Sequence, residues 1–310
     1  IETFTVAIYN AWFGYQDYFS GARLAGILFV FVILLLLLSK KLTESKKAGS
    51  ISRDSFDKIQ LNRTPAIICF SACSLLFLIA FGLPFIQLLA WSDLSEVFLS
   101  SSNIKLFMNS GFLGFFTASL ISITALVLSL AYAGSNKMKS IFTAATIGYA
   151  LPGSVIAVGL LIVINELFGV SITSMGIFGL VLCLSIRFMT PAFQYLISAL
   201  ENIPESSKQA LSTLPVNSLK AFTSLYLPSM RPALLVAFLV VFIEVVKEQP
   251  ATLILRPVGF ETLSSKIYNF TSEGQWELAA NPSLLLVMLS FILDVSYTHL
   301  RAHETLDHLV

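Results

Sequence analysis

Long apolar runs separated by short polar segments dominate the hydrophobic pattern of this chain. A helix needs about 18 or more apolar residues to cross a hydrocarbon core of about 30 Å. The runs show no strict alternation of apolar and polar positions, so they indicate membrane helices rather than barrel strands. The pattern therefore predicts an all-α, polytopic membrane helical bundle of about seven transmembrane helices. The seven candidate spans lie near residues 22–39, 66–90, 110–133, 141–164, 176–199, 231–248 and 283–296.

The positions of Lys and Arg orient these spans. Twelve of these basic residues fall in the loop 40–64, near residues 137–139 and in the loop from 200 to Arg231. The alternate loops hold Lys105, Arg256 and Lys266, with Arg23 at a span boundary. Because loops rich in Lys and Arg stay in the cytoplasm, we expect the loops 40–64 and 200–231 on the cytoplasmic side.

Composition supports a membrane protein and excludes several other classes. Hydrophobic residues make up 56% of the chain and charged residues only 12%, whereas soluble domains have about 25% charged residues. A net charge of +1 gives no sign of nucleic-acid binding. The three histidines all lie in residues 294–310, which resemble translated adaptor sequence, so we interpret this segment as a non-native tail. We therefore expect no metal site.

The loop 200–231 is patterned like two short amphipathic helices. The first begins near Glu205 and ends at Pro215, with Ala210, Leu211 and Leu214 on one face. The second ends at Leu227-Pro228. Two interpretations remain open, because such helices either dock into a groove on a partner protein or lie flat on the lipid surface.

This loop resembles that of the permease subunits of ATP-binding cassette importers. In that family the loop carries Glu-Ala-Ala, a Gly four residues after the last Ala, and a later Leu-Pro. Gln, Leu and Pro replace three of the family residues in this chain. The matching positions are Gln209-Ala210-Leu211, Pro215 and Leu227-Pro228.

Other segments resemble the iron(III)-type branch of the same family, in which two homologous halves are fused into a protein of about twelve helices. The resemblance covers roughly residues 1–293. It implies the type I importer transmembrane fold in a bacterial inner membrane. The segments are Tyr149–Gly153, Ile186-Arg187-Phe188, Glu244–Leu253 and Leu255-Arg256-Pro257.

The resemblance also implies partners and a substrate. A binding protein would deliver substrate outside, most simply ferric iron, and an ATPase dimer would dock inside on the loop 200–231. The chain has no Gly-x4-Gly-Lys-Ser/Thr phosphate loop. We therefore expect no cofactor and no catalytic residue in this chain, with ATP and magnesium bound by the partner ATPase and with lipid around the spans.

An internal repeat indicates how the halves are divided. Residues 2–10 read ETFTVAIYN and residues 261–269 read ETLSSKIYN. Repeats of membrane helices are a common transporter architecture. We expect residues 1–39 to end a first half, with about five further spans preceding them. We expect residues 40–64 to form a cytoplasmic linker and residues 65–293 a second transmembrane domain of six spans.

Polar and special residues within the spans mark a candidate pathway. Pro152-Gly153 predicts a kink or an unwound turn. We expect Arg187 to pair with a carboxylate such as Glu244. Glu244 and Lys247 are also spaced to pair with each other, either to fix helix packing or to take part in cation passage. The full set of candidates is Pro152, Gly153, Arg187, Glu244, Lys247 and Glu248.

Two other function classes are weaker. An ion-coupled secondary transporter would also have repeats and broken helices, but it would need carboxylates near the middle of its spans, where Glu244 is the main candidate. A membrane-embedded enzyme would need a cluster of His or Asp residues at matched depth, and the spans contain none.

Overall fold

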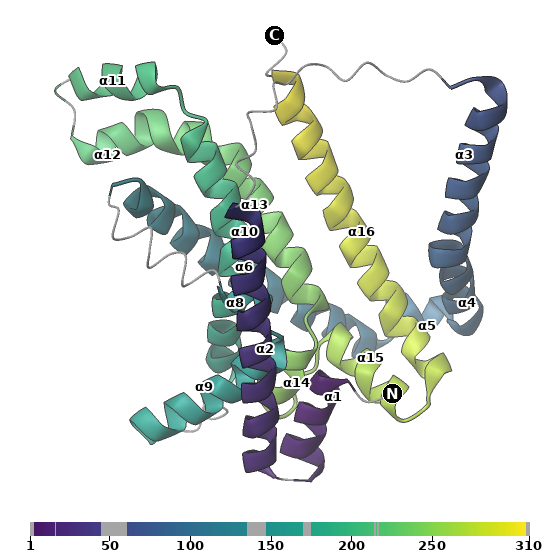
Figure 1. Cartoon of the computed structure of the whole chain (residues 1–310). Coiled ribbons are helices and arrows are strands. Elements are labelled where there is room, and N and C mark those ends of the chain that lie inside the picture. Colours follow the sequence, from purple (N-terminus) through teal and green to yellow (C-terminus); the bar gives the residue numbers. More distant parts are fainter. Residues whose placement is uncertain are drawn as a thin grey trace.

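The computed structural model describes residues 3–15, 17–44, 61–134, 147–169, 175–213, 215 and 217–307, and every regular element in these ranges is a helix (Figure 1). The elements η1, η2 and η4 are π-helical turns that continue neighbouring α-helices. The elements are α1 Phe4–Tyr9, η1 Asn10–Gly14, α2 Tyr18–Glu44, α3 Arg63–Phe77, η2 Leu78–Gly82, α4 Leu83–Trp91, α5 Leu94–Leu99, α6 Ser101–Gly134, α8 Ile147–Ala150, α9 Gly153–Phe168, α10 Ile177–Glu201, α11 Glu205–Thr213, α12 Ser218–Ala221, η4 Phe222–Tyr226, α13 Leu227–Lys247, α14 Pro250–Leu255, α15 Leu263–Ser272 and α16 Trp276–Asp307.

Five helical segments of the described residues are long and apolar enough to cross a membrane. The other two predicted spans correspond to the shorter apolar stretches Phe19–Leu35 and Gly153–Phe168. The span predicted at 141–164 is shortened because Pro152 separates α8 from α9. The five segments are Arg63–Trp91, Ser101–Tyr132, Ile177–Glu201, Ser218–Lys247 and Trp276–Ser296.

Helices α6, α10 and α13 form the centre of the bundle, and each packs against the other two. Small residues allow close approach, as is common between membrane helices. A Cβ atom added to Gly114 on α6 would lie 2.9 Å from Cγ2 of Val246 on α13. Phe188 and Leu184 of α10 are also buried. The centre of the bundle is therefore closely packed.

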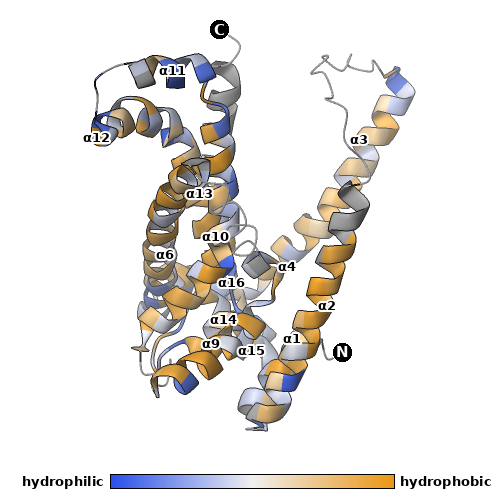
Figure 2. Cartoon of the chain, turned by 60° about the vertical axis from the view of Figure 1, so that its left-hand side comes forward, coloured by the Kyte–Doolittle hydropathy of each residue, from blue (hydrophilic) through white to orange (hydrophobic). Residues whose placement is uncertain are grey.

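The hydrophobic segment Arg63–Trp91 lies apart from this centre. None of its most apolar residues is buried, and only its second part, α4, packs against α16. Figure 1 shows α3 separated from the bundle. Its large apolar side chains, such as Ile68, Phe70 and Leu76, are exposed, and in Figure 2 the hydrophilic colour on α3 is confined to the start of the helix. An apolar surface on every side is expected for a helix in lipid or beside further membrane helices.

The two ends of the bundle carry different elements. Helices α11 and α12 lie together at one end, and α1, α9, α14 and α15 lie at the other (Figures 1 and 2). Helix α3 begins at the same end as α11, as the charge-based prediction expects for the residues that follow the loop 40–64. Residues 45–60 of that predicted loop lie outside the described residues. Following the charge-based prediction, we name the end with α11 and α12 the cytoplasmic end and the opposite one the outer end.

Two boundaries differ from the sequence-based expectation. The second amphipathic helix does not end at Leu227-Pro228, because the helix runs without interruption from Ser218 to Lys247. Pro228 stands at the first turn of α13, and π-helical turn η4 precedes it. The last helix also continues beyond residue 293 to Asp307. The interpretation of residues 294–310 as a non-native tail stays a prediction.

Candidate functional site

The break between α8 and α9 provides a backbone carbonyl that accepts a hydrogen bond from the partly buried Arg187 side chain. Pro152 has φ −58° and ψ 142° and stands at the N-terminal boundary of α9. Proline has no N–H to donate, and it disfavours helical geometry at the residue before it. The carbonyl of Leu151 instead accepts a hydrogen bond of 2.8 Å from Nη1 of Arg187 on α10. The predicted unwound turn at Pro152-Gly153 is therefore present and holds the Arg187 side chain.

Arg187 forms an ion pair with Glu248, the residue that follows α13. Nε of Arg187 lies 3.4 Å from Oε2 of Glu248, and the two side chains are 20% and 5% exposed. The other carboxylate oxygen, Oε1, accepts a hydrogen bond of 3.1 Å from the amide of Ala251 in α14. A buried carboxylate is stable only with such partners. This cluster therefore joins α10, the α8–α9 break and the α13–α14 turn.

The partner of Arg187 differs from the predicted Glu244. Glu244 lies about one turn before Glu248 and forms an ion pair with Lys247, with 3.3 Å between Oε1 and Nζ. The two side chains are 34% and 46% exposed, so this second pair is much more open than the Arg187–Glu248 pair. The expectation that Glu244 and Lys247 share a helix face agrees with this geometry.

Gly153 is needed where the break touches the ion pair. A Cβ atom at this position would overlap Oε1 of Glu248, and it would lie 3.2 Å from both Nη1 of Arg187 and the amide nitrogen of Ala251. Only a residue without a side chain therefore fits between α9 and the carboxylate. The sequence pattern identified Gly153 as a helix breaker, but the structure shows that it also permits this close approach.

The main chain of Glu248 is held as firmly as its side chain. The hydroxyls of Thr252 and Ser264 each donate a 3.0 Å hydrogen bond to the Glu248 carbonyl. Sequence analysis missed the roles of Ala251, Thr252 and Ser264. The sequence did contain one signal for this arrangement, namely Glu248 two positions before Pro250. Pro is common at the first turn of a helix, and a carboxylate is favoured near that end of a helix.

The predicted partner-docking residues lie at the cytoplasmic end, far along the bundle from this cluster (Figure 1). On α11, Gln209 and Ala210 are exposed and Leu211 is half-buried, and Pro215 is also exposed. Leu214 lies outside the described residues. Leu227 is half-buried and Pro228 exposed within the continuous helix that leads into α13.

The arrangement is suited to mechanical coupling. Helix α10 runs from the Arg187 level to the residues just before α11, and the helix Ser218–Lys247 runs from the residues just after α11 back to Glu248. This second helix has 30 residues, or about 45 Å at about 1.5 Å per residue. The described residues contain no group of three His, Cys, Asp or Glu side chains able to hold a metal ion.

Comparison with known proteins identifies related sequences. A family model described as "Binding-protein-dependent transport system inner membrane component" matches residues 137–303. The Fe(3+)-transport system permease protein FbpB 2 of Haemophilus influenzae is 26% identical over 305 residues, which cover 94% of this chain and 59% of that protein. The ferric transport system permease protein FbpB of Actinobacillus pleuropneumoniae is 28% identical over 137 residues, covering 43% of this chain and 20% of that protein.

A solved structure shares the fold. It is described as the crystal structure of a bacterial alginate ABC transporter in complex with an alginate pentasaccharide-bound periplasmic protein. The TM-score is 0.60 at 14% sequence identity, and the match covers 78% of this chain and 95% of the matched chain. The chain thus spans less than two thirds of the first of these curated relatives, while it matches nearly the whole of one chain in the solved complex.

Proposed function

This chain belongs to the family of binding-protein-dependent transport system inner membrane components, and from that membership we propose that it is part of the permease of an ATP-driven importer of ferric iron. As a multi-pass inner membrane component, it is a transport protein. The observation that carries the iron assignment is the match over 94% of the chain to a protein named as an Fe(3+)-transport permease.

The proposed energy source is an ATPase dimer that docks on the cytoplasmic end. Helix α11 offers exposed Ala210 beside half-buried Leu211, which is the kind of small apolar face that a groove on a partner accepts. ATP and magnesium would bind to that ATPase. A substrate-binding protein would deliver iron at the outer end, where α1, α9, α14 and α15 lie (Figure 1).

Coupling in this proposal passes through α10 and α13. In the chain, α11 follows α10 and precedes the helix that leads into α13. A displacement of α11 by the ATPase would therefore move both α10 and α13. These helices pack against each other and are joined near the outer end by Arg187 and Glu248. They would therefore move together rather than slide past each other, and the motion would reach the α8–α9 break and α14.

Uptake of radioactive ferric iron would test the proposal. The intact permease gene would be expressed with its neighbouring ATPase and binding-protein genes in cells that lack other ferric importers. We expect uptake that requires all three components, stops when ATP hydrolysis is blocked, and persists when the proton gradient is dissipated. Uptake that needs no ATPase and stops with the gradient would instead support an ion-coupled transporter.

A further inference from the structure

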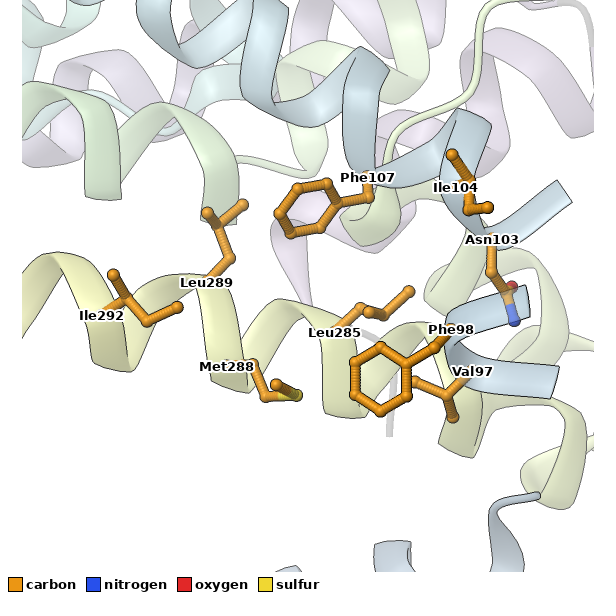
Figure 3. A pocket seen from close by; sticks show the side chains of 9 residues that line it. All are labelled: Val97, Phe98, Asn103, Ile104, Phe107, Leu285, Met288, Leu289 and Ile292. Atoms are coloured by element: carbon orange, nitrogen blue, oxygen red, sulfur yellow. The ribbon is translucent and has the colours of Figure 1, made fainter. Parts of the chain in front are cut away.

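A pocket of about 200 Å³ lies between α16 on one side and α5 and α6 on the other, on different helices from the Arg187–Glu248 cluster. Figure 3 shows side chains of α5 and α6 turned toward those of α16. Among the described residues that line the pocket, only Asn103 is polar, and its side-chain nitrogen donates a 3.0 Å hydrogen bond to the carbonyl of Glu96. The pocket therefore suits an apolar group rather than water or an ion.

The pocket opens at the side of the bundle. Val97 and Leu285 in its lining are buried, whereas Phe98, Met288 and Ile292 in the same lining are 50%, 40% and 58% exposed. Large apolar side chains that are exposed together mark a surface that faces a membrane or a partner. Because α6 and α16 are both long and apolar enough to cross a membrane, hydrocarbon is the medium that this rim contacts. The pocket is therefore a lateral opening toward the bilayer.

The depth of the pocket matches one leaflet of a bilayer. Trp276, at the outer start of α16, is exposed, and Trp is enriched at the membrane–water interface. Asn281 lies just over one turn farther along α16, and the lining residues of this helix run from Leu285 to Ile292. At about 1.5 Å per residue, they lie about 6 to 17 Å beyond Asn281. This range corresponds to about half of a hydrocarbon core of about 30 Å.

A polar cluster stands between the interface level and the apolar pocket. The side chain of Asn281 donates a 3.4 Å hydrogen bond to Oε2 of Glu96 and accepts a 3.2 Å hydrogen bond from the backbone amide of Asp93. Glu96 directly precedes Val97 of the lining, and Asn281 lies one turn before Leu285. Two exposed acidic residues thus border the outer end of the pocket.

The border of the pocket is negatively charged. Hydrogen bonds from the side chain and the backbone amide of Ser95 hold the pKa of Asp93 below its ordinary value, so this carboxylate is ionised near neutral pH. Lys105 is the nearest basic residue along the chain, but it is two positions from Asn103 of the lining, which rotates it about 200° to another face of α6. A pocket that is apolar inside and negative at its mouth is complementary to an amphiphile with a cationic head group.

We propose that the pocket holds an acyl chain of an outer-leaflet phospholipid whose head group carries an ammonium, such as phosphatidylethanolamine, with the ammonium beside Glu96 and Asp93. An apolar cavity of about 150 Å³ takes up benzene, so the volume of this pocket admits a segment of an acyl chain. A helix of the same chain or of a second copy would also cover an apolar pocket, but it gives no role to the negative mouth at head-group depth. The site does not depend on which substrate the permease transports.

Retention of lipid by the purified intact permease would test the site. The protein would be incubated in mixed micelles with equal amounts of phosphatidylethanolamine and anionic phosphatidylglycerol, washed with detergent and analysed for bound lipid by mass spectrometry. We expect the wild type to retain phosphatidylethanolamine in several-fold excess. Met288→Trp places a larger side chain in the pocket and should lower the retained phosphatidylethanolamine several-fold. Phe291→Trp, exposed on the same helix and outside the lining, is the matched control and should retain the wild-type amount.

A second variant tests the negative mouth. Glu96→Gln removes the charge at an exposed position and still accepts the hydrogen bond from Asn281, so it should fold normally. The excess of phosphatidylethanolamine over phosphatidylglycerol should fall several-fold, whereas Glu166→Gln, exposed on α9, is the control and should keep it.

Two results would overturn the proposal. The first is wild-type retention of both lipids in Met288→Trp and in Glu96→Gln. The second is a wild-type permease that retains neither lipid, because a protein helix would then cover the pocket. In that case, dimers that dissociate in Met288→Trp would identify the helix as part of a second copy.

Discussion

At the outer end of the α10–α13 pair, Glu248 is buried and its carboxylate and carbonyl are bound by four groups from α10, α14 and α15, whereas at the cytoplasmic end Ala210 and Pro215 are exposed to solvent. The same two helices thus connect a region in which Glu248 is bound by several groups of the chain to a region that presents exposed residues. The outer cluster has the features of a fixed joint, and the cytoplasmic segment has those of a surface for another protein. The two regions should therefore respond to mutation in different assays.

Removal of the buried carboxylate should have the largest effect. Glu248→Ala leaves Arg187 charged and mostly buried, and breaking a buried pair in this way costs about 3–5 kcal/mol. We expect about 3 kcal/mol, because Arg187 is still 20% exposed and keeps its hydrogen bond to Leu151. The thermal unfolding midpoint of the purified intact permease would fall clearly.

Two controls make this test specific. Glu166→Ala removes an exposed carboxylate from α9 and should change stability by less than about 0.5 kcal/mol. The double variant Arg187→Met with Glu248→Leu removes both charges and should recover most of the lost stability. If Glu248→Ala unfolded at the wild-type temperature, the outer cluster would not be a fixed joint.

An added charge on α11 should have the next largest effect, in binding rather than in stability. Ala210→Glu places a carboxylate where an ATPase groove would close over the helix, at a cost of at most about 3 kcal/mol, or roughly a hundredfold in affinity. We expect little copurified ATPase and little uptake, with normal membrane insertion and normal unfolding. Lys208→Glu is the matched control, because two positions rotate it about 200° to the other face of α11. Normal copurification with Ala210→Glu would favour a helix that lies on lipid.

A single methyl group in the outer cluster should have a smaller effect on stability. Gly153→Ala forces a Cβ atom against Oε1 of Glu248, and overpacking of this kind costs about 1–3 kcal/mol. Gly159→Ala on the same helix is the control, because its Cβ would meet nothing within 4 Å. That change should be neutral or stabilise α9 by up to about 1 kcal/mol. Equal unfolding temperatures for the two variants would contradict the close contact between α9 and Glu248.

The outer cluster also shows the limits of prediction from sequence. Apolar runs and the distribution of Lys and Arg predicted the all-α membrane fold and the shared side of α11 and α3, because these features depend on local composition. Pro152 likewise predicted a break, since its effect on the backbone is local. The choice of Glu248 rather than Glu244 as the partner of Arg187 depends on how α10 and α13 rotate against each other. That rotation is fixed by packing across the whole interface, and a helical pattern does not contain it.

For the cytoplasmic segment, the sequence predicted short amphipathic helices but not where the second one ends. The Pro at position 228 suggested a helix end, but Pro is compatible with the first turn of a helix, and the π-helical turn η4 carries the chain into α13 without a break.

The repeat in residues 2–10 and 261–269 indicated two related halves, yet only the structure shows Tyr9 against Tyr268. Contacts between segments so distant in the chain cannot be derived from the spacing of residues within each one.

The smallest effect should come from the Glu244–Lys247 pair, which lies one turn from the buried cluster but is 34% and 46% exposed. An exposed pair of this kind contributes about 0.5 kcal/mol, so reversing either charge should barely change unfolding. Uptake is the more sensitive measurement, because the pair borders the outer end of α13. If it only fixes packing, Glu244→Lys with Lys247→Glu should restore any uptake lost in either single variant, since opposite charges again face each other. If Glu244 instead contacts the passing cation, the double variant should stay as defective as Glu244→Lys alone, because the carboxylate has moved three positions along the helix. That result would extend the functional part of the outer end beyond the Arg187–Glu248 joint.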